Sequence, residues 1–106
     1  MIKVQIMREA GEAIIGFCVS GHANSAPKGH DIVCAGVSAL TQSAVLGLER
    51  CLKRQFKLDI TSGKLLMELT GSPDERTQAI LETMLLGLQE IARNYPKSVQ
   101  IQEHRR

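Results

Sequence analysis

The sequence predicts an α/β (α+β) fold, a two-layer sandwich in which two long helices pack on a mixed or antiparallel sheet. Apolar residues alternate with polar ones in five short segments, a pattern that is typical of half-buried strands. In two longer segments they recur every three or four residues, which is typical of amphipathic helices. The predicted order is ββαββαβ. Because the 106 residues contain no linker and no repeat, residues 1–106 are predicted to form a single domain.

The first two strands are predicted to form a hairpin. They comprise residues 2–7 and 13–19, with residues 9–12 as the turn between them. Residues 20–30 then follow no period and predict a loop. The apolar face of the second strand is predicted to consist of Ala13, Ile15, Phe17 and Val19.

The first helix is predicted to start immediately after Asp31, which is a favoured residue type directly before a helix. This start makes Cys34 the third residue of the helix. Residues 56–60 and 64–69 alternate again and predict a second hairpin. The inner stripe of the helix is predicted to consist of Val33, Val37, Leu40, Ala44 and Leu48.

The second helix has a clear start signal in the run Ser72-Pro73-Asp74-Glu75. Ser72 is predicted as the N-cap, Pro73 as the first helical residue, and Glu75 as the partner that completes a capping box. The helix should end near Tyr95, and residues 98–104 predict the last strand. The inner stripe is predicted to consist of Ile80, Met84, Leu85, Leu88, Ile91 and Ala92.

Composition narrows the function classes. The net charge is only +2 and aromatic residues make up 3%, so we expect no direct binding of nucleic acid. We read no signal peptide and no apolar run long enough for a membrane span, so the protein is expected to be cytoplasmic with no membrane partner. Three cysteines in a reducing compartment should be thiols, with Cys18 and Cys51 buried as small apolar residues.

Chemistry-bearing residues concentrate between positions 21 and 38. Judged alone, a cysteine is most often a core residue, a loop histidine is solvated, and Asp31 is a helix cap. Together, Cys34 at a helix start and His22 at a strand end form a candidate nucleophile and base on rigid elements, and His30 is the weaker candidate base. Gly21 allows a tight turn before His22, and Ser38 lies one helical turn after Cys34.

A zinc site is an alternative interpretation of the same stretch. His22, His30 and Cys34 could supply three ligands, but their spacing matches none of the usual structural zinc patterns. A thioredoxin-like role lacks the C-x-x-C motif. We therefore predict no metal and no cofactor.

The segments GHA (21–23) and GHDIVCAGVS (29–38) resemble the motif of the ribosomal-processing cysteine protease family, Prp, and the similarity extends over the whole chain. The resemblance implies a small cytosolic bacterial homodimer with a Cys/His dyad, here Cys34 and His22. It implies removal of the N-terminal extension of large-subunit ribosomal protein twenty-seven. That extension ends in a bulky, aromatic-containing sequence, so a hydrophobic groove is also implied.

The supporting residues have roles that stay open at this point. Asp31 could cap the helix or orient His22, and capping is the favoured interpretation. Ser38 could support the thiol or line the groove, and residues 23–29 are predicted to act as a lid over the peptide. The alternative functions are a non-catalytic ribosome-associated binding module that uses the same groove, and a zinc-dependent hydrolase.

Overall fold

A computed structural model describes residues 1–21 and 30–106, apart from the side chains of residues 30 and 31. The predicted ββαββαβ order is confirmed, and the first helix continues into a short π-helix, η1. The elements are β1 (Ile2–Arg8), β2 (Ile14–Ser20), α1 (His30–Leu46), η1 (Gly47–Cys51), β3 (Phe56–Thr61), β4 (Lys64–Leu69), α2 (Glu75–Asn94) and β5 (Val99–Arg105).

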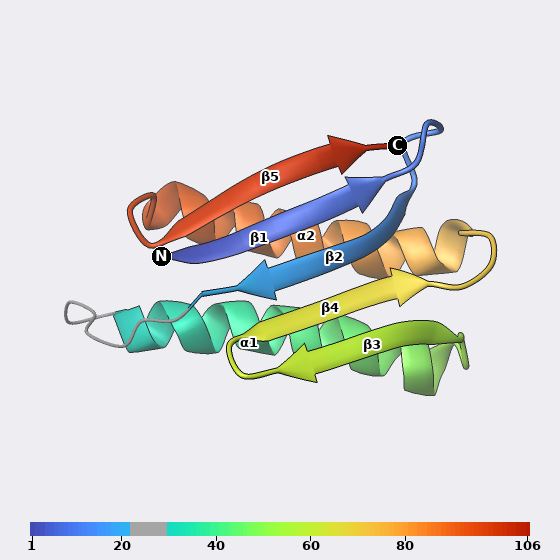
Figure 1. Cartoon of the computed structure of the whole chain (residues 1–106), viewed down its shortest axis with the longest axis horizontal. Coiled ribbons are helices and arrows are strands. Elements are labelled where there is room, and N and C mark those ends of the chain that lie inside the picture. Colours follow the sequence, from blue (N-terminus) through green and yellow to red (C-terminus); the bar gives the residue numbers. More distant parts are fainter. Residues whose placement is uncertain (22–29) are drawn as a thin grey trace.

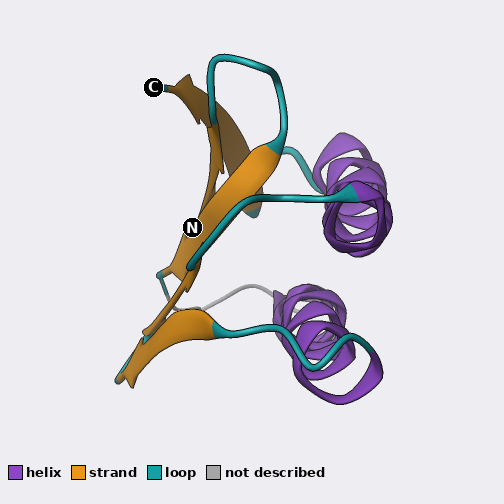
Figure 2. Ribbon diagram, turned by 90° about the vertical axis from the view of Figure 1, so that its right-hand side faces the viewer, coloured by secondary structure: helices purple, strands orange, loops and turns teal. Residues whose placement is uncertain are grey.

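The strands form one mixed sheet in the order β3-β4-β2-β1-β5 (Figure 1). The central strand β1 pairs in parallel with β5, and the remaining pairs are antiparallel. Both helices lie on the same side of the sheet, so the molecule has two layers (Figure 2). The core lies between these layers and is almost entirely aliphatic, as the scarcity of aromatic residues requires.

The predicted apolar face of β2 is correct at Phe17 and wrong at its start. Ile14 is fully buried, whereas Ile15 is only half-buried. The cause is a register shift between β1 and β2, in which Met7 pairs with Gly16 but the next residue, Arg8, pairs with Ile14. The extra residue in β2 changes which side chains face the helices, a bulge that strict alternation cannot anticipate.

Helix α1 buries the predicted stripe but begins two residues earlier than expected. Its first residue is His30, so Asp31 lies inside the first turn rather than directly before the helix. Cys34 is consequently the fifth residue of α1 and not the third. Because an acidic residue is favourable throughout the first turn of a helix, Asp31 marks the region of the start without specifying its first residue.

The segment Ile32–Cys51 is 20 residues long and apolar enough to cross a membrane by length and composition, contrary to our expectation. In this structure it is the helix that covers one half of the sheet. Its buried side chains, among them Val37 and Leu48, contact the sheet and α2 as part of the core. About 33% of this membrane-length window is buried within the protein, so burial in the core accounts for part of its apolar content.

Cys51 is exposed, so the prediction that it is buried is wrong. The reason is the π-helix, in which the Leu52 amide donates to the Gly47 carbonyl at 3.2 Å and the winding is wider than in α1. The wider turn rotates residues after Leu48 away from the buried stripe. Cys18 is half-buried and lies opposite Gln5, on the sheet face away from the helices.

Helix α2 has a capping box, but two residues later than predicted. The N-cap is Asp74, whose carboxylate accepts from the Thr77 amide at 2.8 Å, while the Thr77 hydroxyl accepts from the Asp74 amide at 3.0 Å. The hydrogen bond from the Thr77 amide is the main cause that lowers the pKa of Asp74. Two overlapping capping patterns occur in this run, and the carboxylate of Asp74 also lies 3.5 Å from Arg54.

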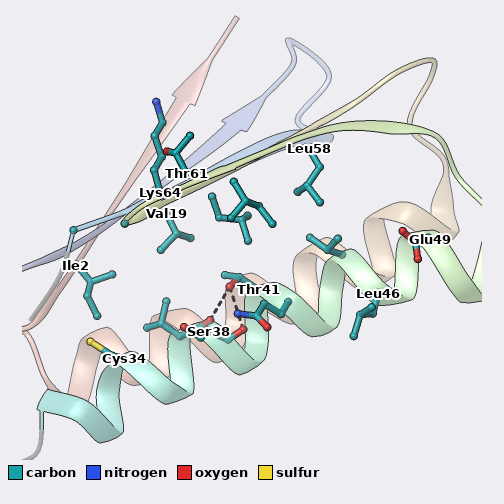
Figure 3. A pocket seen from close by; sticks show the side chains of 17 residues that line it. Ile2, Val19, Cys34, Ser38, Thr41, Leu46, Glu49, Leu58, Thr61 and Lys64 are labelled. Atoms are coloured by element: carbon teal, nitrogen blue, oxygen red, sulfur yellow. Dashed lines mark hydrogen bonds between the residues drawn. The ribbon is translucent and has the colours of Figure 1, made fainter.

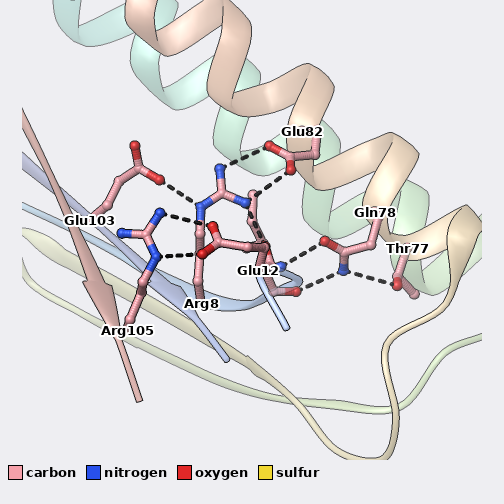
Figure 4. Close-up of polar contacts among 8 residues, drawn as sticks. Arg8, Glu12, Thr77, Gln78, Glu82, Glu103 and Arg105 are labelled. Atoms are coloured by element: carbon pink, nitrogen blue, oxygen red, sulfur yellow. Dashed lines mark hydrogen bonds and ion pairs between the residues drawn. The ribbon is translucent and has the colours of Figure 1, made fainter. Parts of the chain in front are cut away.

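An ion-pair cluster ties the N-terminal half of α2 to the sheet (Figure 4). The Arg8 side chain is only 11% exposed, and it donates to both carboxylate oxygens of Glu82, at 3.0 and 3.1 Å. It also donates to Glu103 at 2.6 Å and to the Glu12 carbonyl at 2.7 Å. The hydrogen bonds with Glu82 and then Glu103 raise the pKa of Arg8, so this cation links β1, α2 and β5 throughout the physiological pH range.

Gln78 makes a second link between α2 and the sheet. Its amide oxygen accepts from the Ile14 backbone N–H at 2.6 Å, and its amide nitrogen donates to the Ile14 carbonyl at 2.8 Å (Figure 4). These bonds satisfy the backbone of β2 at the position where the bulge interrupts its pairing with β1.

Gly21 ends β2 in a conformation that other residues rarely adopt. Its φ is +101°, and its amide donates to the Gly63 carbonyl at 3.1 Å. A Cβ atom at this position would clash with the carbonyl oxygen of Met1. The turn predicted before His22 therefore requires glycine for two separate reasons.

Replacing Gln78 by alanine should lower the free energy of unfolding by about 1–3 kcal/mol, because the buried side of the Ile14 backbone loses both partners. The measurement is urea unfolding followed by circular dichroism. Gln89→Ala on the exposed side of α2 is the matched control and should change stability by less than about 0.5 kcal/mol. Equal effects of the two substitutions would show that the Gln78 bonds contribute nothing specific.

Gly21→Ala should lower the free energy of unfolding by about 1–3 kcal/mol or more, because a positive φ is strained for alanine and its Cβ meets the Met1 carbonyl. Thermal unfolding measures the loss. Gly11→Ala is the control, since its Cβ would have open space and only Glu9 within 4.0 Å. A Gly21→Ala protein as stable as Gly11→Ala would contradict the described turn.

Candidate active site

A cavity of about 560 Å³ lies between α1 and the β3–β4 hairpin (Figure 3). We call it the α1–β3 groove. One wall comes from α1 and η1, and the other comes from β3, β4 and the end of β2. Three of the residues predicted for the site line this groove: Gly21, Cys34 and Ser38.

Cys34 lies at one end of the groove, near Ile2 (Figure 3). The side chain is half-buried and packs against the core, so the helix holds the thiol in a defined place. As the fifth residue, Cys34 lies just beyond the first helical turn, where the effect of the helix dipole on a negative charge is already weaker. The helix therefore positions this thiol, and its activation as a nucleophile requires a base.

Ser38 and Thr41 continue the helical wall beyond Cys34. Ser38 is exposed and lies one turn after the cysteine, as predicted. The Thr41 hydroxyl is buried and donates to the Val37 carbonyl at 2.9 Å and more weakly to the Ser38 carbonyl at 3.3 Å. Ser38 thus lines the groove with an exposed side chain, whereas the Thr41 hydroxyl is hydrogen-bonded within the helix.

The opposite wall is apolar. The family resemblance implied a hydrophobic groove, but the residues that form this wall were not predicted. Leu58 and Ile60 are 42% and 64% exposed, although they face the same side of the sheet as their partners, the core residue Met67 and the partly buried Leu65. Exposed aliphatic side chains that line a concave surface indicate a binding site for apolar groups. Their alternation in FKLDI predicts a strand, but the pattern does not reveal that this strand lies at the sheet edge.

The groove carries a negative charge at the end away from Cys34. Glu49, from η1, lies near that end beside Leu46 (Figure 3). The backbone of Lys64, at the start of β4, lies toward the Cys34 end, but its side chain points away from α1 (Figure 3). Between Cys34 and Glu49 the lining is mostly aliphatic.

Several predicted residues fall outside the described part of the chain. These are His22, the predicted lid 23–29, and the side chains of His30 and Asp31. Within the described residues, no three His, Cys, Asp or Glu side chains gather as metal ligands. The zinc alternative depends on the side chains of His22 and His30, which lie outside the described part of the chain.

Comparisons with known proteins agree with the geometry. The family model described as cysteine protease Prp matches residues 1–100. The ribosomal processing cysteine protease Prp of Bacillus subtilis (strain 168) is 33% identical to the chain, covering 95% of it and 96% of the relative.

Two solved structures of the Staphylococcus aureus ribosomal processing protease Prp have the same fold. One is in complex with a substrate peptide, with 26% identity, a TM-score of 0.91, and coverage of 98% of this chain and 100% of that chain. The other carries a covalently linked product peptide, with 27% identity, a TM-score of 0.88 and the same coverage. With a family model that spans nearly the whole length, this chain belongs to the Prp family of cysteine proteases.

Proposed function

We propose that this protein removes a short N-terminal extension from large-subunit ribosomal protein twenty-seven. The observation that carries the proposal is the position of Cys34 at one end of a groove with an apolar wall. Such a groove suits a peptide with bulky apolar residues next to the cleaved bond. One relative is named a ribosomal processing cysteine protease, and a related structure contains a substrate peptide. Both names support the same substrate class.

The proposed reaction is acyl transfer to the cysteine followed by hydrolysis. The Cys34 sulfur attacks the scissile carbonyl carbon while its proton passes to His22. His22 then donates that proton to the leaving amine, so the C–N bond breaks and a thioester remains on Cys34. Water attacks the thioester and restores the thiol, with the extension released as a free carboxylate.

Asp31, Ser38 and Gly21 are proposed to support this reaction. Asp31 lies in the first turn of α1, close in sequence to Cys34, so its negative charge would disfavour a thiolate on Cys34. A positively charged imidazolium on His22, which Asp31 would stabilise, would offset this cost. Ser38 contacts the peptide from the helical wall, and Gly21 sets the direction in which the chain leaves β2. Residues 23–29 are proposed to close over the bound peptide.

The family resemblance further supports a homodimer that works in the cytoplasm on a newly made ribosomal protein. The active site itself is proposed to require no metal and no cofactor. The peptide extension is the proposed partner, and nucleic acid and membrane are not.

Cys34→Ser should abolish cleavage of the extended ribosomal protein, and His22→Ala should lower the rate by roughly 10²–10⁴-fold, the usual contribution of a general base. Mass spectrometry of the substrate measures the loss of the extension. Cys51→Ser removes an exposed thiol outside the groove and should cleave normally. Full activity of Cys34→Ser would reject the nucleophile, and unprocessed substrate with the unchanged protein would favour the binding-module alternative.

Iodoacetamide should modify Cys34 faster than Cys51, although Cys51 is the more exposed thiol. The reason is that alkylation requires the thiolate, which a nearby imidazole favours. Peptide mapping over a time course at neutral pH gives the order of modification. In His22→Ala the order should reverse, because exposure alone then decides. Faster modification of Cys51 in the unchanged protein would argue against an activated Cys34.

A further inference from the structure

We infer that Glu49 recognises a basic residue of the substrate, six or seven positions before the cleaved bond. The inference rests on the proposed function and concerns the same groove. It depends on three features of the structure: the direction in which the groove runs from Cys34, its length, and the chemistry of its far end.

The direction of the groove determines which part of the substrate it can hold. Helix α1 begins at one end of the long axis of the molecule, and the groove runs from Cys34 along that helix (Figures 1 and 3). On the proposed function, the substrate after the cleaved bond continues into the whole ribosomal protein, which is far too large for a cavity of about 560 Å³. The short extension before the cleaved bond therefore occupies the groove, and the body of the protein stays outside at the Cys34 end.

The length of the groove gives the number of residues that it holds. Cys34 lies in α1 and Glu49 lies in η1, which continues the same helix. At about 1.5 Å per residue, this stretch of helix spans roughly 22 Å. An extended peptide advances about 3.3 Å per residue, so about six or seven residues lie between the two side chains. The peptide residue beside Glu49 is thus the sixth or seventh before the cleaved bond.

The chemistry of the far end selects a positive charge. The wall between Cys34 and Glu49 is mostly aliphatic and offers no competing anion among the described lining residues. The carboxylate of Glu49 is 59% exposed, and its contact with Arg50, at 3.9 Å, is long and between two exposed side chains. Such a pair is weak, so the carboxylate can exchange it for a lysine or arginine of the peptide.

The experiment uses a peptide series that carries the extension, with a single lysine placed at each position from five to eight before the cleaved bond and glutamine elsewhere. For the unchanged protein, kcat/KM should rise about two- to fivefold with lysine at position six or seven, the range of an exposed ion pair. The gain should vanish in Glu49→Gln and near 1 M salt, where charges are screened within about 3 Å. Glu90→Gln is the matched control, because it removes an arginine-paired carboxylate from α2 outside the groove and should keep the gain.

Binding of the same peptides to Cys34→Ser, measured by fluorescence anisotropy, separates this inference from the proposed function. Cleavage with no dependence on lysine position, or a dependence that persists in Glu49→Gln, overturns the role of Glu49 and leaves the protease intact. Absent cleavage combined with lysine-dependent binding that Glu49→Gln removes overturns the protease function and supports the role of Glu49. In Glu49→Lys the preference should reverse, so that glutamate at position six or seven raises kcat/KM. This reversal would support direct recognition of charge.

Discussion

Two helices must cover five strands, and this mismatch of widths shapes the rest of the structure. Five strands at about 4.8 Å spacing make a sheet roughly 19 Å wide, whereas two packed helices lie only about 8–10 Å apart. Helix α2 packs toward β5 and β2, so α1 is left with the other half of the sheet. The inward face of the edge strand β3 therefore stays partly uncovered at Leu58 and Ile60. The groove is the space between α1 and this partly uncovered strand.

Polar contacts fix the sheet and α2 at one end of the molecule, and the predicted site lies at the other end. At the end where α2 begins, Arg8 and Gln78 make paired hydrogen bonds that fix the helix against the sheet (Figure 4). At the other end, β2 stops at Ser20 and α1, which starts at His30, carries Cys34. A strand and a helix that are anchored elsewhere can hold a nucleophile and a base more accurately than a free loop can.

Most of the fold could be predicted from hydrophobic periodicity, because each strand and helix buries one face. The exact ends and registers of the elements could not be predicted where two neighbouring residues carry the same signal. Ser72 and Asp74 are both good caps, and only the contacts of Asp74 with Thr77 and Arg54 decide between them. The β2 bulge and the π-helix change the periodicity by one residue each, so Ile15 and Cys51 were assigned to the wrong environment.

The candidate site was predictable in its chemistry and not in its shape. Cys34 and Ser38 follow from the helical spacing of a recognisable motif, and both line the groove. Its apolar wall could not be derived, because strand alternation in residues 56–60 gives no information on which strand lies at the edge. Edge position is a property of the whole sheet order, and it converts two ordinary core-facing residues into binding residues. A peptide that fills this groove must consequently be extended and carry apolar side chains against Leu58 and Ile60, which is consistent with the proposed cleavage of a terminal segment rather than a bond within a folded domain.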